Sequence, residues 1–223
     1  MKVSVVVPVL NEAEYLPPLL LQLRQLIDQA VDVVVADGGS TDATVNLVRQ
    51  AGFCVVVGSR GRARQMNLGA THAKGALLLF LHADNRLPAD WLEAVQSQFT
   101  PKKCWGRFDV RISGRSSMLP IIATLMNWRS RWTGIATGDQ AMFMTREAFL
   151  KVGGFPDQPL MEDIEMSRRL LDISRPACIA SKTTTSGRRW ESRGVWSTIF
   201  LMWRLRWRYW RGHPAIELAK DYS

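Results

Sequence analysis

The sequence contains few cysteines and no pattern of cysteines that would bind a metal or form a disulfide framework. The three cysteines, Cys54, Cys104 and Cys178, are far apart and odd in number. Structural zinc sites need closely spaced pairs, and small secreted domains use even sets for disulfides. We therefore expect buried, reduced thiols in a cytoplasmic protein.

Long apolar runs are also absent. No stretch reaches the roughly 18 apolar residues that a membrane-spanning helix needs. The N-terminal apolar run is interrupted by Pro8, Asn11 and Glu12, and no small-residue cleavage site follows it. We therefore expect neither a secretory signal peptide nor a membrane anchor of this kind, which again favours a cytoplasmic location.

The turn after the first apolar run lacks the glycine-rich loops of two other nucleotide-binding classes. Without Gly-x-Gly-x-x-Gly, a dinucleotide-binding oxidoreductase is disfavoured. A sugar-phosphate nucleotidyltransferase is an alternative function. The absence of a Gly-x-Gly-x-x-Arg-like loop disfavours it, and release of pyrophosphate would distinguish it from the other functions. Pro8, Asn11 and Glu12 stand in this turn instead. They either face a base or ribose or form an ordinary turn in which Asn11 caps a helix.

The charge is mainly positive and unevenly spread. There are 29 Lys and Arg against 20 Asp and Glu, a formal charge of +9. Residues 188–211 hold seven arginines and one glutamate, and so contribute +6 of that total. A basic segment of this kind favours anionic partners, which are phosphates, nucleic acid or anionic lipid headgroups.

The hydrophobic pattern predicts an α/β fold. Short β-branched runs alternate with amphipathic stretches, which indicates a largely parallel central sheet with flanking helices. We expect strands over residues 3–9, 31–36, 54–57, 76–81, 105–112 and 140–144, and helices over 11–30, 41–51, 62–74, 88–99, 146–152, 161–171 and 194–211. Residues 115–133 are expected to form a helix or a lid.

Two carboxylates directly follow predicted strands. Asp37 begins the segment Asp-Gly-Gly-Ser-Thr-Asp, and Asp84 ends the segment His-Ala-Asp. Ligands of open α/β sheets bind outside the carboxyl ends of the strands, where such side chains can face one crevice. Asp84 could hold Mg²⁺ or Mn²⁺ on a phosphate-bearing substrate, and His82 is either a second ligand or a core histidine.

Two further segments lie at predicted helix starts. Arg62, Arg64 and Gln65 begin one helix, where the helix dipole and the guanidinium groups favour a diphosphate; the alternative is a solvated basic turn. Glu162 and Asp163 begin another, where a carboxylate is either a general base or a favourable charge at the helix N-terminus.

The last predicted helix is rich in tryptophan and arginine. Its aromatic residues recur at spacings of four, three, four and three, which places them on one stripe: Trp196, Phe200, Trp203, Trp207 and Trp210. Helices of this kind lie in membrane interfaces. The alternatives for this helix are packing on the catalytic domain or an oligomer contact. The alternative for the whole protein is a non-catalytic protein that binds nucleotide-sugars, or one that stacks single-stranded nucleic acid bases on these side chains.

Together these motifs resemble the family-2 glycosyltransferases, which share the GT-A fold. The resemblance covers essentially the whole chain. It rests on residues 8–12, 37–42, 61–67, 82–84, 137–140, 159–163 and 185–191. The sequence is similar to a small bacterial branch that is often labelled "transferase 2, radical-SAM/selenodomain-associated".

The resemblance implies a role for each matching residue. Pro8, Asn11, Glu12 and Asp37 would line the nucleotide pocket. Asp84 matches the last Asp of the metal-binding Asp-x-Asp motif, with His82 in place of the usual Asp. Asp163 matches the catalytic base, beside Glu162, and Asp139 matches an acidic position between acceptor and donor sugar. On the acceptor side the corresponding positions are Gln140, Arg188, Arg189 and Trp190.

The resemblance thus implies an inverting, metal-dependent transferase. The donor would be a UDP- or GDP-linked sugar and the acceptor a hydroxyl compound, which the tryptophan- and arginine-rich helix indicates to be lipid-linked or otherwise held at a membrane. We expect no nucleic acid partner. Ser186 stands where processive members have Gln, which argues against a polymerase. We predict a catalytic domain over residues 1–190 and a helical extension over 191–223, at the inner face of the cell membrane.

Overall fold

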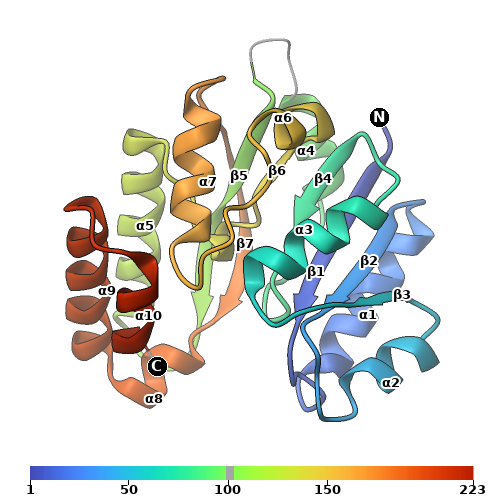
Figure 1. Cartoon of the computed structure of the whole chain (residues 1–223), viewed down its shortest axis with the longest axis horizontal. Helices are drawn as coiled ribbons and strands as arrows, with labels where there is room; N and C mark the ends of the chain where they lie inside the picture. The colour runs from blue at the N-terminus through green and yellow to red at the C-terminus, as the bar shows by residue number, and fades with distance from the viewer. Residues whose placement is uncertain (99–102, 223) are drawn as a thin grey trace.

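The computed structural model describes residues 1–98 and 103–222. Its core is a seven-stranded sheet with the strand order β3-β2-β1-β4-β6-β5-β7 (Figure 1). The first four strands are mutually parallel: β1 (Val3–Val9), β2 (Asp32–Asp37), β3 (Cys54–Val57) and β4 (Leu77–Phe80). This half of the sheet confirms the predicted α/β alternation.

The other half of the sheet departs from the simple alternation. β6 (Phe143–Thr145) runs antiparallel to both β4 and β5 (Trp105–Ser113), while β7 (Ala177–Ser186) runs parallel to β5. A strand predicted over 140–144 is shifted, because Gln140 belongs to the short 3₁₀ helix η1 (Gly138–Gln140). The sequence analysis missed β7 altogether.

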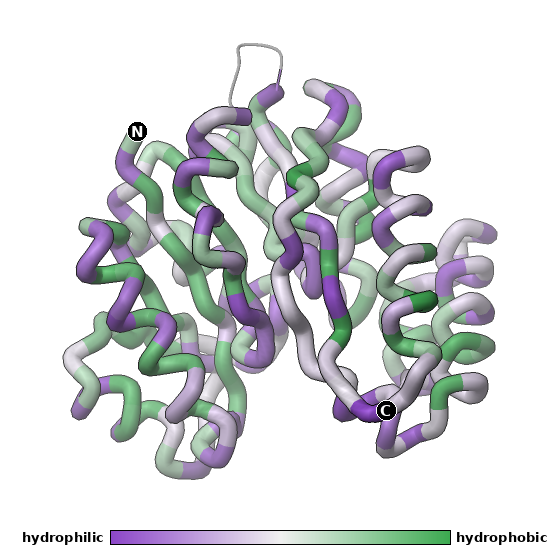
Figure 2. The backbone as a smooth tube through the Cα atoms, turned by 180° about the vertical axis from the view of Figure 1, so that it is seen from behind, coloured by the Kyte–Doolittle hydropathy of each residue, from purple (hydrophilic) through white to green (hydrophobic). Residues whose placement is uncertain are grey.

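Helices cover both faces of the sheet. On one face lie α1 (Leu16–Asp28), α2 (Thr44–Gln50) and α4 (Trp91–Gln98), and on the other α3 (Arg62–His72), α6 (Arg146–Lys151) and α7 (Glu162–Leu171). β1 shows why: Val5 and Val7 pack against the first set and Val6 against the second. Figure 2 shows the hydrophobic central strands between helices in which hydrophobic and hydrophilic residues alternate.

Four helices gather beside β5 and β7. They are α5 (Leu119–Thr133), α8 (Arg188–Arg193), α9 (Val195–Trp210) and α10 (Ala215–Tyr222). α5 follows β5 and α9 follows β7 by way of α8, and the starts of α5 and α9 pack together, so the two helices run side by side in the same direction (Figure 1). None of the helices in the described ranges is long and apolar enough to span a bilayer.

Several predicted boundaries were wrong for local reasons. α1 begins at Leu16, not at residue 11, and Asn11 does not cap it; Asn11 has a left-handed backbone with φ of 53° in the preceding turn. α4 begins at Trp91, and residue 99 of that predicted helix lies outside the described residues. Cys54 is exposed on the edge strand β3, so it is not a buried thiol.

Candidate active site

Asp37 ends β2 and folds its own loop. Its side chain is fully buried, and its carboxylate accepts hydrogen bonds from the backbone N–H groups of Gly39 and Ser40, each at 2.8 Å. The Ser40 hydroxyl donates to the other carboxylate oxygen. Asp37 therefore shapes the predicted nucleotide-binding loop from beneath, and its backbone rather than an open carboxylate borders the crevice.

The turn after β1 is fastened to this loop. The Asn11 amide oxygen accepts the backbone N–H of Thr41 at 2.9 Å, and the Asn11 backbone N–H donates to the Ser40 hydroxyl. The Glu12 backbone N–H donates to Thr44 at 2.9 Å. These bonds leave the Glu12 carboxylate free to face the crevice, where burial raises its pKa and the charge of Arg188 opposes that rise.

Gln65 joins the ends of β1 and β2 from α3. Its buried amide nitrogen donates to the carbonyl oxygens of Val9 and Ala36, at 2.6 and 3.1 Å. A Cβ at Gly38 would lie 2.8 Å from the Gln65 amide carbon, so a glycine is required for this close approach. The structure therefore places Gln65, like the buried Pro8 in β1, beneath the crevice floor.

His82, Asp84 and Asp139 meet where β4 ends. The His82 Nδ1 atom lies 3.9 Å from a carboxylate oxygen of Asp139. Burial raises the pKa of Asp139, but His82, together with the charges of Arg62 and Arg189, outweighs burial and lowers it. Burial and then the charge of Asp139 raise the pKa of Asp84. The two negatively charged carboxylates thus repel each other in one partly buried space. A bound cation would relieve that repulsion.

These side chains fit a divalent cation that binds together with a phosphate-bearing substrate. In the described part of the chain, no three His, Cys, Asp or Glu side chains form a closed metal site. Mg²⁺ is commonly held by one or two carboxylates together with substrate phosphates, not by an all-protein cage. Asp84 and Asp139 supply oxygen donors of this type, and His82 supports Asp139.

Glu162 and Asp163 begin α7 on the opposite wall. The two carboxylate oxygens of Asp163 accept the backbone N–H groups of Gly138, at 2.9 Å, and of Ile164, at 2.7 Å. Glu162 is 3% exposed and pairs with Arg62 at 3.4 Å. Burial and the neighbouring Asp163 raise the pKa of Glu162, while Arg62 opposes that rise.

The two walls converge on Gly138. A small cavity is lined by Met66, Phe80, His82, Gly138, Met142, Phe155, Glu162 and Asp163. The His82 ring packs so closely on Gly138 that a Cβ there would overlap it. The predicted metal and base residues are therefore held around one backbone position.

The predicted arginines take different places. Arg62 faces the carboxylates: burial lowers its pKa, but Glu162, Asp163, Asp139 and Asp84 outweigh burial and raise it. Arg64 instead pairs with Asp157 at 2.7 Å on the surface, away from these carboxylates. Arg188 stacks over the Tyr15 ring, 3.7 Å from its centre, and so brings α8 to the mouth of the crevice.

The predicted acceptor-side residues are only partly exposed to the crevice. Arg189 stacks on Tyr222 at 4.2 Å, and its charge acts on Asp139 and Asp84. Trp190 packs against the α5 cluster. Gln140 is fully buried, where it completes the capping of η1. Gln140 and Trp190 therefore support the site from behind.

A family model described as "Glycosyl transferase family 2" matches residues 4–153. A probable glycosyltransferase of Bacillus subtilis, YdaM, is 24% identical over 97% of this chain and 56% of its own length. The match to the family model ends before α7, so Glu162 and Asp163 lie outside it.

Solved structures share the fold. A mannosyltransferase from Pyrobaculum calidifontis, in complex with GDP-Man and Mn²⁺, superimposes with a TM-score of 0.66 at 23% identity, over 92% of this chain and 60% of the other. TarS of S. aureus, residues 1–349 with UDP-GlcNAc, gives 0.66 at 20% identity, over 83% and 58%. The chain thus spans little more than half the length of these relatives.

Proposed function

The chain belongs to glycosyl transferase family 2, and from that premise we propose that it moves a sugar from a nucleoside-diphosphate donor to an acceptor hydroxyl with inversion at the anomeric carbon. The observation that carries the proposal is the convergence on Gly138. Asp163 hydrogen-bonds its backbone N–H, His82 packs on its Cα, and the next residue is Asp139. Base and donor-binding carboxylates are thereby held at a fixed separation.

The donor side of the site is assigned to the ends of β1, β2 and β4. Asp84 and Asp139, supported by His82, would hold Mg²⁺ or Mn²⁺ against the diphosphate. The cation supplies positive charge that stabilises the departing diphosphate. The loops of residues 11–13 and 38–44, braced by Asn11, Asp37 and Gln65, form the floor for the nucleoside.

Asp163 is assigned as the base. Each of its oxygens already accepts one backbone N–H, which fixes the orientation of the carboxylate, and a carboxylate has further lone pairs to accept a proton. The acceptor oxygen attacks the anomeric carbon and gives its proton to Asp163. The bond from the anomeric carbon to the diphosphate breaks on the opposite face, and the nucleoside diphosphate leaves.

Positive side chains accompany that departure. Arg62 is placed between the carboxylates of both walls, and Arg188 acts on Glu12 and Asp84 at the mouth. Guanidinium groups form strong charge-assisted hydrogen bonds to phosphate oxygens. We assign Arg62 and Arg188 to the diphosphate, while Arg64 is committed to Asp157.

The site lies beside an apolar surface that suits a membrane. α9 and α5 each carry a stripe of side chains that are more than half exposed: Trp196, Phe200, Trp203, Trp207 and Trp210, and Ile121, Leu125, Trp128 and Trp132. In two helices that run in the same direction, these stripes flank the contact from the same side. Tryptophan-rich amphipathic faces with nearby arginines bind membrane interfaces.

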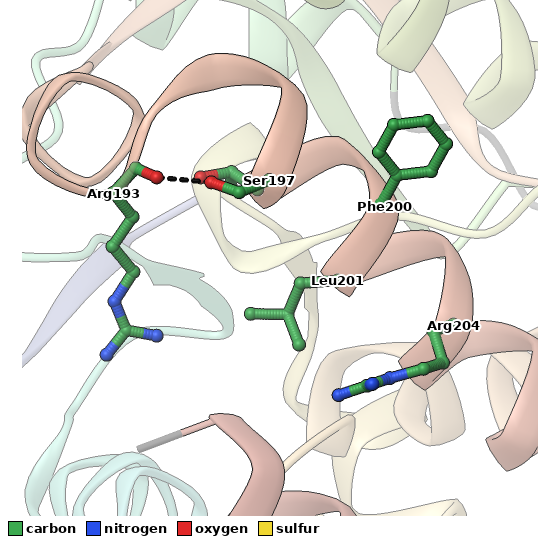
Figure 3. Close-up of a pocket in the computed structure, with 6 residues that line it drawn as sticks. Arg193, Ser197, Phe200, Leu201 and Arg204 are labelled. Atoms are coloured by element: carbon green, nitrogen blue, oxygen red, sulfur yellow. Dashed lines mark hydrogen bonds between the residues drawn. The ribbon is translucent and has the colours of Figure 1, made fainter.

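A pocket of about 370 Å³ on α9 adds to this surface. Figure 3 shows Arg193 and Arg204 on either side of Leu201. Basic residues near an anionic surface contribute about 1 kcal/mol each. We therefore assign the protein to the surface of an anionic membrane, with an acceptor held there.

Nucleotide release tests the proposed reaction. UDP-, GDP- and TDP-sugars would be supplied with Mg²⁺ or Mn²⁺, and the released nucleotide separated from the donor. One nucleoside diphosphate, released only with the cation, is the expected result. Pyrophosphate as the product, or no binding of any donor with either cation, would contradict the proposal.

A further inference from the structure

Two arginines that no part of the proposed reaction uses, one on α5 and one on α9, lie close enough for the charge of one to lower the pKa of the other. On α5, Met118, Ile122 and Met126 pack toward α9, and Arg129 continues this stripe. On α9, Val195 and Ile199 pack toward α5, and Arg206 lies seven residues, about two turns, beyond Ile199. The apolar contact between the two helices therefore ends in a pair of guanidinium groups.

These guanidinium groups lack partners. Within residues 1–98 and 103–222, the buried Nε and Nη2 atoms of Arg129 and the buried Nε atom of Arg206 have no hydrogen-bond partner. Arg146, a structural arginine, is different. Its Nε, Nη1 and Nη2 atoms donate to the carbonyl oxygens of Gly75, Ala70 and Ala73.

The surroundings of the two arginines disfavour their positive charge. Burial first, and then the charges of Arg206 and Arg107, lower the pKa of Arg129 to about 9, and burial also lowers the pKa of Arg206. Asp163 is the acid whose charge acts most on both groups, yet it makes no ion pair with either. Unpaired charge away from water is costly, and an anion between the two groups would offset that cost.

We propose that the acceptor carries a phosphate group, which Arg129 and Arg206 hold beside Asp163. This inference rests on the proposed glycosyl transfer. A guanidinium presents paired N–H donors that match two phosphate oxygens, so two of them can enclose one phosphate. A phosphate held there would place a nearby hydroxyl of the same molecule beside the Asp163 carboxylate, which is proposed to take its proton.

The position of the pair also defines where the rest of the acceptor goes. The exposed stripes of α5 and α9 flank the contact between the two helices, with Trp128 next to Arg129 and Trp207 next to Arg206 in sequence. An alkyl chain attached to the phosphate could lie along these side chains. A water-soluble phosphate ester would use only the two arginines.

Binding of two probes to the full chain tests the assignment and distinguishes these sources. Inorganic phosphate and dodecyl phosphate, below its micelle concentration, would be titrated calorimetrically in chloride buffer. Arg129→Met and Arg206→Met remove the guanidinium and keep an aliphatic side chain. Arg24→Met is the matched control, because Arg24 is an exposed arginine of α1 that the proposals do not use.

We expect dodecyl phosphate binding to weaken at least about tenfold in Arg129→Met and Arg206→Met and to stay within about twofold in Arg24→Met. Tighter binding of dodecyl phosphate than of inorganic phosphate supports a lipid phosphate, and equal binding supports a soluble one. Binding of neither probe, or equal loss in all three variants, overturns the inference.

Two further readouts keep the result interpretable. Without phosphate, the unfolding temperatures of Arg129→Met and Arg206→Met should equal or exceed that of the wild type, since an uncompensated charge is removed. A lower unfolding temperature together with intact phosphate binding would show that the arginines are structural. Titration of the nucleotide-sugar donor with Mn²⁺ in the same samples separates the proposed glycosyl transfer from the proposed phosphate site. A wild type that binds the donor but neither phosphate probe refutes only the phosphate site.

Discussion

The Oδ2 atom of Asp163 lies 2.9 Å from the backbone nitrogen of Gly138, so the first turn of α7 is hydrogen-bonded to the short helix that carries Asp139. The His82 ring packs on the other side of Gly138. The proposed base and the proposed donor-binding carboxylate are therefore fixed by the same backbone position. We therefore expect substitutions at individual residues of this site to have distinct, measurable effects.

Asp163→Asn should abolish most turnover and leave donor binding nearly unchanged. The amide keeps the shape of the side chain but cannot take the acceptor proton, and general base catalysis is typically worth about 10²–10⁴-fold. The measurement is nucleotide release at saturating donor, with a parallel donor titration. Glu165→Gln, on the same helix but paired with Arg169, is the control and should retain activity.

Glu162→Gln should stabilise the protein progressively as the pH rises. The folded-state pKa of Glu162 is raised above its ordinary value of 4.5, so the folded protein holds this proton at a higher pH than the unfolded chain does. Glu162 therefore costs stability as the pH rises from 4.5 through the raised value.

Thermal unfolding between about pH 4 and pH 7 checks this sign, with the exposed Glu14→Gln variant as control. The difference in unfolding temperature between Glu162→Gln and the wild type should grow toward pH 7. A difference that shrinks with rising pH would show that the ion pair with Arg62 outweighs burial.

Gln65→Leu should lower the free energy of unfolding by about 1–2 kcal/mol, because two hydrogen bonds to strand-end carbonyl groups are lost. It should also weaken donor binding, since the loops after β1 and β2 lose their common support. Urea unfolding measures the first effect. Gln25→Leu, at an exposed position of α1, is the control, and equal effects of both variants would contradict a positioning role.

Trp203→Ser with Trp207→Ser should reduce binding to vesicles that contain phosphatidylglycerol. These side chains are 66% and 57% exposed on α9, so their replacement removes apolar contact with the interface and leaves the packed side of the helix intact. Co-sedimentation measures the loss. Leu21→Ser, exposed on α1, should bind like the wild type; binding that survives the double substitution would refute a membrane role for this face.

The first half of the fold was predictable because each strand is a short apolar run, valine-rich in β1, β2 and β3 and leucine-rich in β4. β7 escaped prediction because Lys182, Thr183 and Thr184 read as a polar segment, although threonine favours strands. Its pairing with β5 joins residues far apart in sequence. No local pattern of hydrophobicity encodes such a partner.

The candidate site was predictable in part. Asp84, Asp139 and Glu162 follow strand ends or open short helices, and the structure brings them together. Gln65 and Gln140 were assigned to ligands from their place in motifs, whereas their buried amides bond to the protein itself. Arg129 was not singled out in the sequence, and Arg206 only as one arginine of the basic segment 188–211, because only the packing of α5 beside α9 brings these two unpartnered side chains near each other.

The most direct test of the donor site is a calorimetric titration of the donor nucleotide-sugar into the wild type and Asp84→Ala, with and without Mn²⁺. The wild type should bind the donor far more tightly with the cation, and Asp84→Ala should lose at least about tenfold of that affinity, because a carboxylate ligand of the cation is gone. Donor binding that is equally tight without Mn²⁺ and unaffected by Asp84→Ala would contradict the assignment of Asp84 and of the crevice around Gly138.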